Sequence, residues 1–130
     1  MILDTTFLVD AERSGADLDR VIRDEDDVAI AAVSVAELTV GVELAEGKTR
    51  QRRRQFLDGV LEVIPVIDYD LAVASAHAGL LVAIRRQGRP RGAHDLLIAA
   101  TAVASDRVVV TADVTAFADL PGVSVQHHRK

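Results

Sequence analysis

The sequence predicts an α/β protein with a mostly parallel central sheet that helices cover on both faces. Short apolar segments alternate along the chain with longer segments of helical periodicity, which is typical of βα units. Residues 28–33 are continuously apolar over the length of a strand, as expected for a strand buried on both faces. Residues 93–103 are apolar on nearly every side behind Asp95, which predicts a helix inside the domain.

The other elements follow from the same two patterns. Strands are expected at residues 1–3, 28–33, 63–67, 107–110 and 123–125. Helices are expected at residues 7–12, 34–45, 49–61, 68–87, 93–103 and 114–118, with further helical spacing over 18–22 before an acidic turn at 24–27. Asp68 is the expected cap of the longest helix, and Pro65 makes 63–67 an edge strand. We expect one domain over residues 1–130, ending in a polar tail at 126–130.

Composition narrows the class of protein. The chain has 130 residues, of which 49% are hydrophobic and 27% charged, so it can bury a core of its own. It contains no cysteine, which excludes disulfides and thiolate metal sites and favours the cytoplasm. The first residues have no basic segment typical of a signal peptide, and the uncharged stretch 71–84 is too short to span a bilayer. We therefore expect a soluble cytoplasmic protein with no membrane partner.

The charge pattern leaves nucleic-acid binding open. A formal net charge of −5 argues against a nucleic-acid-binding protein. The arginines are nevertheless clustered, at 50 and 52–54 and again at Arg85, Arg86, Arg89 and Arg91. The first cluster fits a solvated helix face equally well. The second leads directly into Asp95, so we expect it to contact phosphates.

Four carboxylates lie at junctions between predicted elements. They are Asp4, Glu37, Asp95 and Asp113. Each has a structural alternative, because Asp4 can simply end a strand, Ser34 and Glu37 fit a capping box, and the other two suit helix caps. However, ligands of parallel sheets bind at the carboxyl ends of the strands, where these junctions gather. The topology therefore predicts one acidic cluster.

Such a cluster needs a cation. Four neighbouring carboxylates repel one another, so without a cation some of them would stay protonated. Oxygen ligands without thiolates suit Mg²⁺ or Mn²⁺, which activate water and neutralise phosphoryl transition states. Thr6 and Thr111 adjoin the acids and could hold a carboxylate by hydrogen bonds, although both also suit turns. The histidines lack zinc-site spacing; His77 reads as packing, and His94 as a neighbour of Asp95 that points to solvent.

The motifs that contain these acids resemble the PIN-domain family, specifically the toxin nucleases of VapBC toxin–antitoxin pairs. The resemblance covers nearly the whole chain, through the opening Ile-Leu-Asp-Thr-Thr, Ser-Val-Ala-Glu-Leu-Thr-Val-Gly from 34, His-Asp-Leu-Leu-Ile-Ala-Ala-Thr-Ala from 94, and Val-Val-Thr-Ala-Asp before 114. It implies an α/β/α sandwich and a Mg²⁺- or Mn²⁺-dependent ribonuclease. The resemblance also implies that Asp4 and Asp95 bind the metal and that Glu37 and Asp113 complete the site.

The same resemblance implies partners. It predicts a cognate VapB-type antitoxin lying across the groove, and a homodimer or a toxin–antitoxin hetero-oligomer. The activity expected is endonucleolytic hydrolysis of RNA phosphodiesters, with Glu37 orienting or deprotonating the attacking water. Two alternatives stay open: a non-catalytic PIN-fold module that binds RNA or protein, and a phosphate-transfer or receiver-like domain with Asp4 as nucleophile. The second lacks the Asp-x-Asp pairing expected after the first strand.

Overall fold

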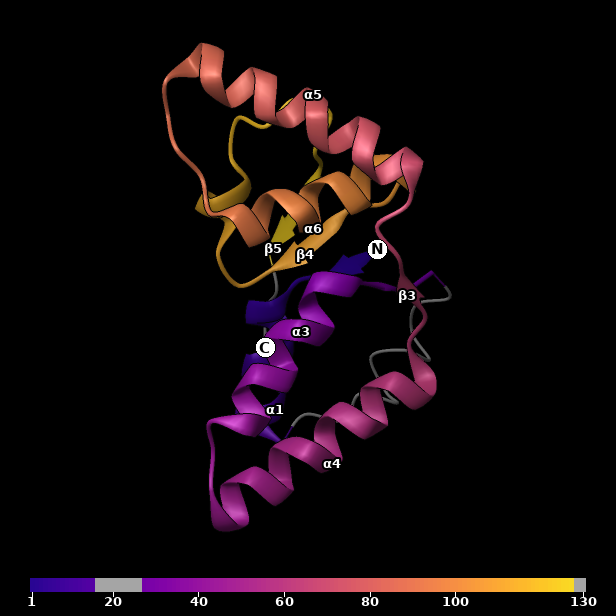
Figure 1. Ribbon diagram of the computed structural model, residues 1–130, viewed down its shortest axis with the longest axis vertical. Coiled ribbons are helices and arrows are strands. Elements are labelled where there is room, and N and C mark those ends of the chain that lie inside the picture. The colour runs from indigo at the N-terminus through magenta and orange to yellow at the C-terminus, as the bar shows by residue number, and fades with distance from the viewer. Residues whose placement is uncertain (16–26, 128–130) are drawn as a thin grey trace.

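The structure is a computed structural model that describes residues 1–15 and 27–127, arranged as Figure 1 shows. The strands are β1 (Ile2–Leu3), β2 (Ile30–Ala31), β3 (Val66–Ile67), β4 (Val109–Thr111) and β5 (Val125–His127). The helices are α1 (Thr5–Ser14), α3 (Ala32–Glu43), α4 (Gly47–Val63), α5 (Leu71–Gln87), α6 (Ala93–Ala104) and the short 3₁₀ helix η1 (Val114–Phe117). The helical spacing at 18–22, the acidic turn up to residue 26 and residues 128–130 lie outside the described residues.

Every strand pair in the described parts of the chain is parallel. β4 pairs with β1 on one side and with β5 on the other, while β2 pairs with β3. A parallel bridge between Ile2 and Ala29 joins the two sheets, and the backbone N–H of Leu3 donates to the Ala29 carbonyl at 3.1 Å. The strands therefore run in the spatial order β3-β2-β1-β4-β5. This confirms the parallel sheet, and β3 with its preceding Pro65 lies at an edge as expected.

Helices cover both faces of this sheet. Successive β1 residues point to opposite faces. Ile2 belongs to a buried cluster with Leu80 of α5 and Ala99 of α6, whereas Leu3 belongs to a second cluster with Phe7 of α1 and Val60 of α4. In Figure 1, α6 lies between α5 and the strands, and α1, α3 and α4 fill the other half of the view. The expected α/β/α sandwich is confirmed.

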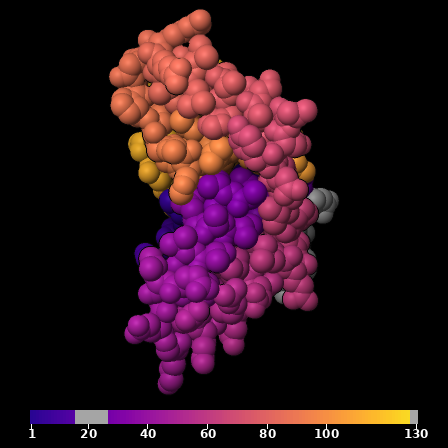
Figure 2. Space-filling model, in the orientation of Figure 1, coloured from indigo at the N-terminus to yellow at the C-terminus, as the bar shows by residue number. Residues whose placement is uncertain are grey.

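Helix α6 is the central helix of the core. Its residues 98–102 are all buried, as is Leu96. It packs against α5, α3, β1, β2 and β4, which fixes its position from several sides. Figure 2 shows α3, in purple, in the middle of the visible face, between the orange of α6 and the magenta of α4. A carboxylate on the first turn of α6 is therefore held by the whole core.

The segment at 28–33 is a shorter strand than the sequence predicts. Only Ile30 and Ala31 form β2, and Val33 already belongs to α3. Ser34 therefore lies inside the helix, whose N-cap is Ala31 with no side-chain cap bond, so the predicted capping box with Glu37 is wrong. A continuous apolar run cannot distinguish a buried strand from a buried helix start, and here it contains both.

Other boundaries differ by a few residues. The N-cap of α5 is Asp70, whose carboxylate accepts from the backbone N–H of Val73, and Asp68 is not the cap. Helix α1 is longer than the expected 7–12, α4 begins at Gly47, two residues before the expected start, and takes in Val63. β4 begins later than residue 107, and β5 extends over Gln126 and His127. The polar tail expected from 126 is wrong for those two residues, because pairing with β4 holds polar side chains in an exposed strand.

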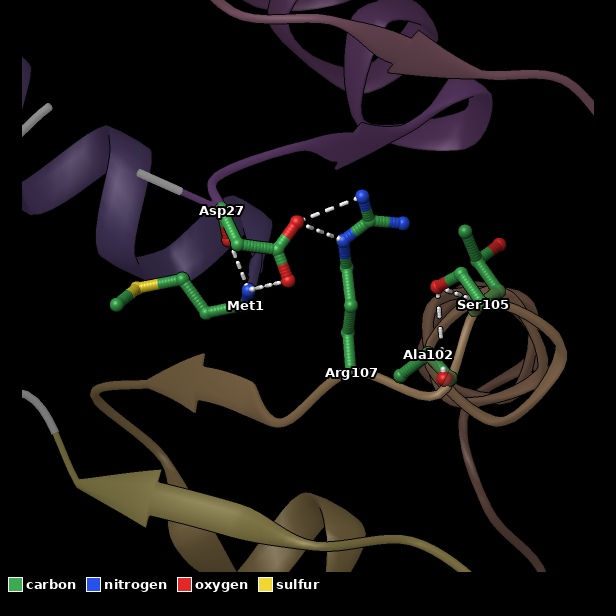
Figure 3. Close-up of polar contacts among 6 residues, drawn as sticks. Met1, Asp27, Ala102, Ser105 and Arg107 are labelled. Atoms are coloured by element: carbon green, nitrogen blue, oxygen red, sulfur yellow. Dashed lines mark hydrogen bonds and ion pairs between the residues drawn. The ribbon is translucent and has the colours of Figure 1, made fainter. Parts of the chain in front are cut away.

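Ion pairs connect the chain segments at the ends where the parallel strands begin (Figure 3). The Asp27 carboxylate receives Arg107 Nη2 at 2.7 Å and Nε at 2.9 Å, and the amino group of Met1 contacts the Asp27 carbonyl and carboxylate. The hydrogen bond from Arg107 lowers the pKa of Asp27. The contacts therefore stabilise the fold above the ordinary carboxyl pKa and weaken as the pH falls through the lowered value.

In the described chain, no helix combines the length and apolarity needed to cross a membrane.

Candidate active site

The acids singled out from the sequence come from separate elements to the carboxyl ends of β1 and β4. Asp4 follows β1 and caps α1, Asp113 follows β4, Glu37 lies in α3, and Asp95 lies in the first turn of α6. A cavity of about 280 Å³ opens beside Asp4, Glu37 and Asp95. Its other lining residues are Thr5, Thr6, Val9, Asp10 and Arg13. Asp113 is exposed and does not line this cavity, but its charge raises the pKa values of Asp4 and Asp95.

Asp4 is the most buried of these acids, at 1% exposure. Its Oδ1 accepts from the backbone N–H of Phe7 at 2.9 Å, and Oδ2 accepts from Thr111 Oγ1 at 2.5 Å. Thr6 Oγ1 lies 2.8 and 3.0 Å from the two oxygens. Burial raises the pKa of Asp4, against the lowering by the hydrogen bonds from Thr111, Phe7 and Thr6. The carboxylate is thus fixed by donors yet still lacks full compensation for its buried charge.

The two threonines are themselves oriented by the backbone. The N–H of Asp113 donates to Thr111 Oγ1 at 2.9 Å, and the N–H of Ala112 donates to Thr6 Oγ1 at 3.3 Å. Each hydroxyl therefore has a backbone donor behind it and can turn its own proton toward Asp4. The two hydroxyl oxygens lie 3.2 Å apart. Thr6 and Thr111 thus connect the end of β1 to the end of β4.

The carboxylate of Glu37 is held by residues that the sequence did not single out as supports. Thr5 Oγ1 donates to Oε1 at 2.7 Å and lies 3.0 Å from the buried Ser34 Oγ. His94 Nδ1 lies 3.3 Å from Oε2, so His94 turns toward the acids rather than to solvent. Ser34 and Glu37 are three positions apart on one face of α3. This spacing is the sequence signal that could have indicated that Ser34 lies near Glu37. Nothing local marks Thr5 or His94, because they approach from other elements.

Asp95 receives no hydrogen bond on its side chain from any described residue. It lies in the first turn of α6, three residues after the N-cap Gly92, which settles its helical position as first-turn acid rather than cap. Burial raises its pKa most, followed by the charges of Asp4, Glu37 and Asp113, while His94 lowers it. A carboxyl group with free oxygens among like charges is the member of this group best suited to receive a cation.

Asp113 occupies the N-cap position of η1 without making the cap bond. Its Oδ1 accepts from Thr115 Oγ1 at 2.6 Å. The predicted capping role is therefore wrong for its side chain, and the residue stays exposed. Its backbone N–H supports Thr111 at the same time.

These residues suit a hard divalent cation by their chemistry. All the candidate ligands are carboxylate oxygens, and the charges of Asp4, Glu37 and Asp113 raise the pKa of Asp95, so a bound cation would relieve their repulsion. Within residues 1–15 and 27–127, however, no three His, Cys, Asp or Glu side chains converge as they would around one metal ion. The Glu37 side chain points toward Thr5 and His94. Loading a cation would therefore need rotation of the Glu37 side chain.

Gly92 leaves the space in which the Asp95 carboxylate lies. A Cβ added at residue 92 would come 2.9 Å from Asp95 Oδ2, closer than such contacts tolerate. The backbone of Gly92 has φ −61°, which any residue adopts, so the substitution moves Asp95 without straining the chain. We expect Gly92→Ala to weaken Mn²⁺ binding, measured by calorimetry, about tenfold with little change in melting temperature.

Gly79→Ala is the matched control, because its Cβ would meet nothing within 4 Å on helix α5. It should keep Mn²⁺ affinity and gain about 0.5–1 kcal/mol of helix stability. Equal Mn²⁺ affinities of the two variants would contradict the steric role of Gly92.

The second arginine cluster divides into structural and free members. Arg91 donates to the carbonyls of Ala118 at 2.6 Å and Thr115 at 3.1 Å, which holds the end of η1. Arg89 pairs with Asp119 at 3.4 Å. Arg85 and Arg86 lie exposed in the last turn of α5, without a partner among the described residues. Arg91 is therefore engaged, whereas Arg85 and Arg86 are available.

The first arginine cluster is engaged within the protein. Arg50 and Arg54 both pair with Glu43, Arg52 pairs with Glu12 at 2.9 Å, and Arg53 donates to a carbonyl of α3. These contacts fasten α4 to α3 and α1. They favour the structural interpretation of this cluster.

Fold and site together define a PIN-type α/β/α protein with acids gathered at the carboxyl edge of its sheet. The chain belongs to the PIN domain family, whose model matches residues 1–123. It is 31% identical over 98 residues to the tRNA(fMet)-specific endonuclease VapC of Salmonella typhimurium, which covers 75% of this chain and 72% of that protein. The family resemblance of the sequence is confirmed.

Solved structures agree with this assignment. A member of the VapBC family of toxin–antitoxin systems, VapBC-5 from Mycobacterium tuberculosis, matches 99% of this chain and 97% of its own, at 33% identity and a TM-score of 0.76. VapBC2 from Rickettsia felis, bound to a DNA fragment from their promoter, matches 98% of each chain at 24% identity and a TM-score of 0.87. The latter likeness concerns the fold alone.

Proposed function

We propose that this chain is the toxin of a VapBC-type toxin–antitoxin pair and acts as a Mg²⁺- or Mn²⁺-dependent endoribonuclease. The observation that carries the proposal is the meeting of Asp4, Glu37, Asp95 and Asp113 at one sheet edge of a PIN-family chain. Its VapC relatives are named ribonucleases or endonucleases, which supports the activity. The name of the Salmonella relative makes transfer RNA the first substrate to test.

In this proposal, the acids, threonines and arginines of the site have different roles in the reaction. Asp4 and Asp95, completed by Glu37 and Asp113, would hold the cation, which supplies charge to a phosphoryl transition state and lowers the pKa of bound water. Thr6 and Thr111 hold Asp4 in place through its oxygens. Glu37 would orient the attacking water and accept its proton at a carboxylate oxygen. The free guanidinium groups of Arg85 and Arg86, with Arg89 and Arg91 as weaker candidates, would contact RNA phosphates.

An antitoxin would cover the apolar surface beside the acids. Val40 and Leu44 at the end of α3 are 55% and 81% exposed. A cavity of about 220 Å³ between α1, α3 and α4 shares Glu37 with the acidic cavity and has Phe56 in its wall. A VapB-type segment lying along this groove would bury the apolar surface and reach the acids. A homodimer or a toxin–antitoxin hetero-oligomer is part of the same proposal.

Cleavage of a defined RNA tests the activity. Purified protein freed of any partner should cleave an initiator tRNA transcript with Mg²⁺ or Mn²⁺, and lose this activity in excess EDTA because the acids then repel without compensation. Adding back either cation should restore it. An RNA hairpin of unrelated sequence distinguishes selective from general cleavage. Metal-independent activity would refute the mechanism, and no cleavage of any RNA would favour the non-catalytic module.

A further inference from the structure

The carboxylate of Glu37 is held from both sides by residues of different elements. Thr5, at the start of α1, contacts Oε1, and His94, at the start of α6, contacts Oε2. Oε1 therefore accepts a hydrogen bond from Thr5, and Oε2 has His94 Nδ1 at 3.3 Å, whereas the Asp95 side chain receives no hydrogen bond from the described residues. The position of Glu37 is set by where α1 and α6 begin, as well as by α3 itself.

The Thr5 side of this contact is anchored in the core. Ser34 Oγ is completely buried and lies 3.0 Å from Thr5 Oγ1. A hydroxyl has one proton, and Thr5 directs its proton to the carboxylate at the shorter distance of 2.7 Å. The buried Ser34 hydroxyl stays in contact with the Thr5 hydroxyl. Thr5 thus connects Glu37 Oε1 to a buried polar group of α3.

The His94 side chain is exposed and makes no contact with the core. The His94 side chain is 59% exposed and joins none of the buried clusters, and its contact with Glu37 is its one polar side-chain contact with a described residue. Loss of the imidazole should therefore leave the fold intact. His94 therefore acts on the site through its contact with Glu37 and through its charge, which lowers the pKa of Asp95.

We propose that His94 is a positioning residue, which together with Thr5 fixes the carboxylate of Glu37 relative to Asp4 and Asp95 through the contact of its Nδ1 with Oε2. The proposal rests on the proposed nuclease function for its kinetic consequence, but the geometry of Glu37 can be tested without RNA. Groups that orient a ligand typically change metal affinity or activity by about ten- to a hundredfold. Because His94 is exposed, its effect belongs at the lower end of that range.

Substitutions that keep or remove a polar atom at the place of His94 Nδ1 test this proposal. The amide nitrogen of Asn occupies nearly the place of Nδ1 in His, whereas that of Gln lies nearer the place of Nε2. His94→Asn should therefore keep a polar contact with Glu37 Oε2, and His94→Gln and His94→Ala should lose it. His77→Ala is the matched control, because that histidine lies on α5 and contacts Tyr69 instead.

The experiment measures Mn²⁺ affinity by calorimetry, then kcat and KM on one RNA substrate, for each variant. We expect His94→Ala and His94→Gln to weaken Mn²⁺ binding and lower kcat about tenfold, with KM and melting temperature unchanged. His94→Asn should stay within about twofold of the parent protein on both measures, as should His77→Ala. Parent-like values for His94→Ala, or equal rescue by Gln and Asn, would overturn the role of Nδ1. Absence of cleavage by the parent protein would instead refute the nuclease function, and the Mn²⁺ titration would still decide the positioning.

Discussion

Replacing Asp95 by asparagine should lower RNA cleavage about a thousandfold and at the same time stabilise the metal-free protein. Each tenfold loss corresponds to about 1.4 kcal/mol. In the proposed function Asp95 is an anionic metal ligand, and removing such a ligand from a phosphoryl-transfer site costs several kcal/mol. The Asp95 side chain accepts no hydrogen bond from the described residues, so the amide breaks no native contact there. The activity is measured on the RNA that the parent protein cleaves.

The stability gain follows from the raised pKa of Asp95. Its pKa is above the ordinary 3.8 because of burial and the charges of Asp4, Glu37 and Asp113. The folded protein therefore binds this proton more tightly than the unfolded chain does. As the pH rises from 3.8 through the raised value, the metal-free parent loses stability, and above that window the full penalty remains. The asparagine side chain carries no charge, so the Asp95→Asn variant should melt a few degrees higher near neutral pH and depend less on pH.

Adding a divalent cation should reverse this difference in melting temperature between the parent protein and Asp95→Asn. Mn²⁺ should raise the melting temperature of the parent protein, because it binds the folded state, and should do so much less for Asp95→Asn. Asp58→Asn serves as control, since Asp58 is exposed on α4 away from the cavity. A parent-like response of Asp95→Asn to Mn²⁺, or full cleavage, would exclude Asp95 from the site.

The sequence predicted the acidic cluster because each acid follows a recognisable core element or precedes one. Asp4 comes directly after a buried strand, and Asp95 precedes an apolar helix, so the parallel topology alone brings them to one edge. The supports of Glu37 could not be predicted in this way. Thr5 and His94 reach it across 32 and 57 positions of the chain, a pairing that depends on the angle at which α1 and α6 start.

The predicted boundaries of helices and strands are wrong where the same residue type fits two kinds of structure. The apolar residues after Ile30 continue without a break from β2 into α3, so no local signal shows that Ser34 is inside a helix. Asp68 and Asp70 are both good caps, and only the fold selects the second. Gln126 and His127 are polar because β5 exposes them, although the backbone pairs with β4. In each case, tertiary contacts decide between two states that local sequence permits.

Replacing Thr111 by valine should destabilise the protein by about 2 kcal/mol, because it removes a hydrogen bond to a buried charge. Valine has nearly the shape of threonine and suits a strand, so no cavity and no loss of strand propensity enter the comparison. The Thr111 hydroxyl donates to Asp4 at 2.5 Å and accepts from the N–H of Asp113 at 2.9 Å. The variant leaves both of these groups without that partner. Urea unfolding measures the change in free energy.

Thr101→Val is the control that makes this result specific. Thr101 is also buried, on α6, but its hydroxyl donates to the Leu97 carbonyl within its own helix, so its loss should cost little. The Thr111→Val penalty should shrink as the pH falls, because a protonated Asp4 leaves no buried charge to stabilise. Equal penalties for the two variants at neutral pH would mean that Thr111 contributes packing alone. A larger penalty for Thr111→Val, together with weaker Mn²⁺ binding, would mean that the end of β4 holds Asp4 ready for the cation.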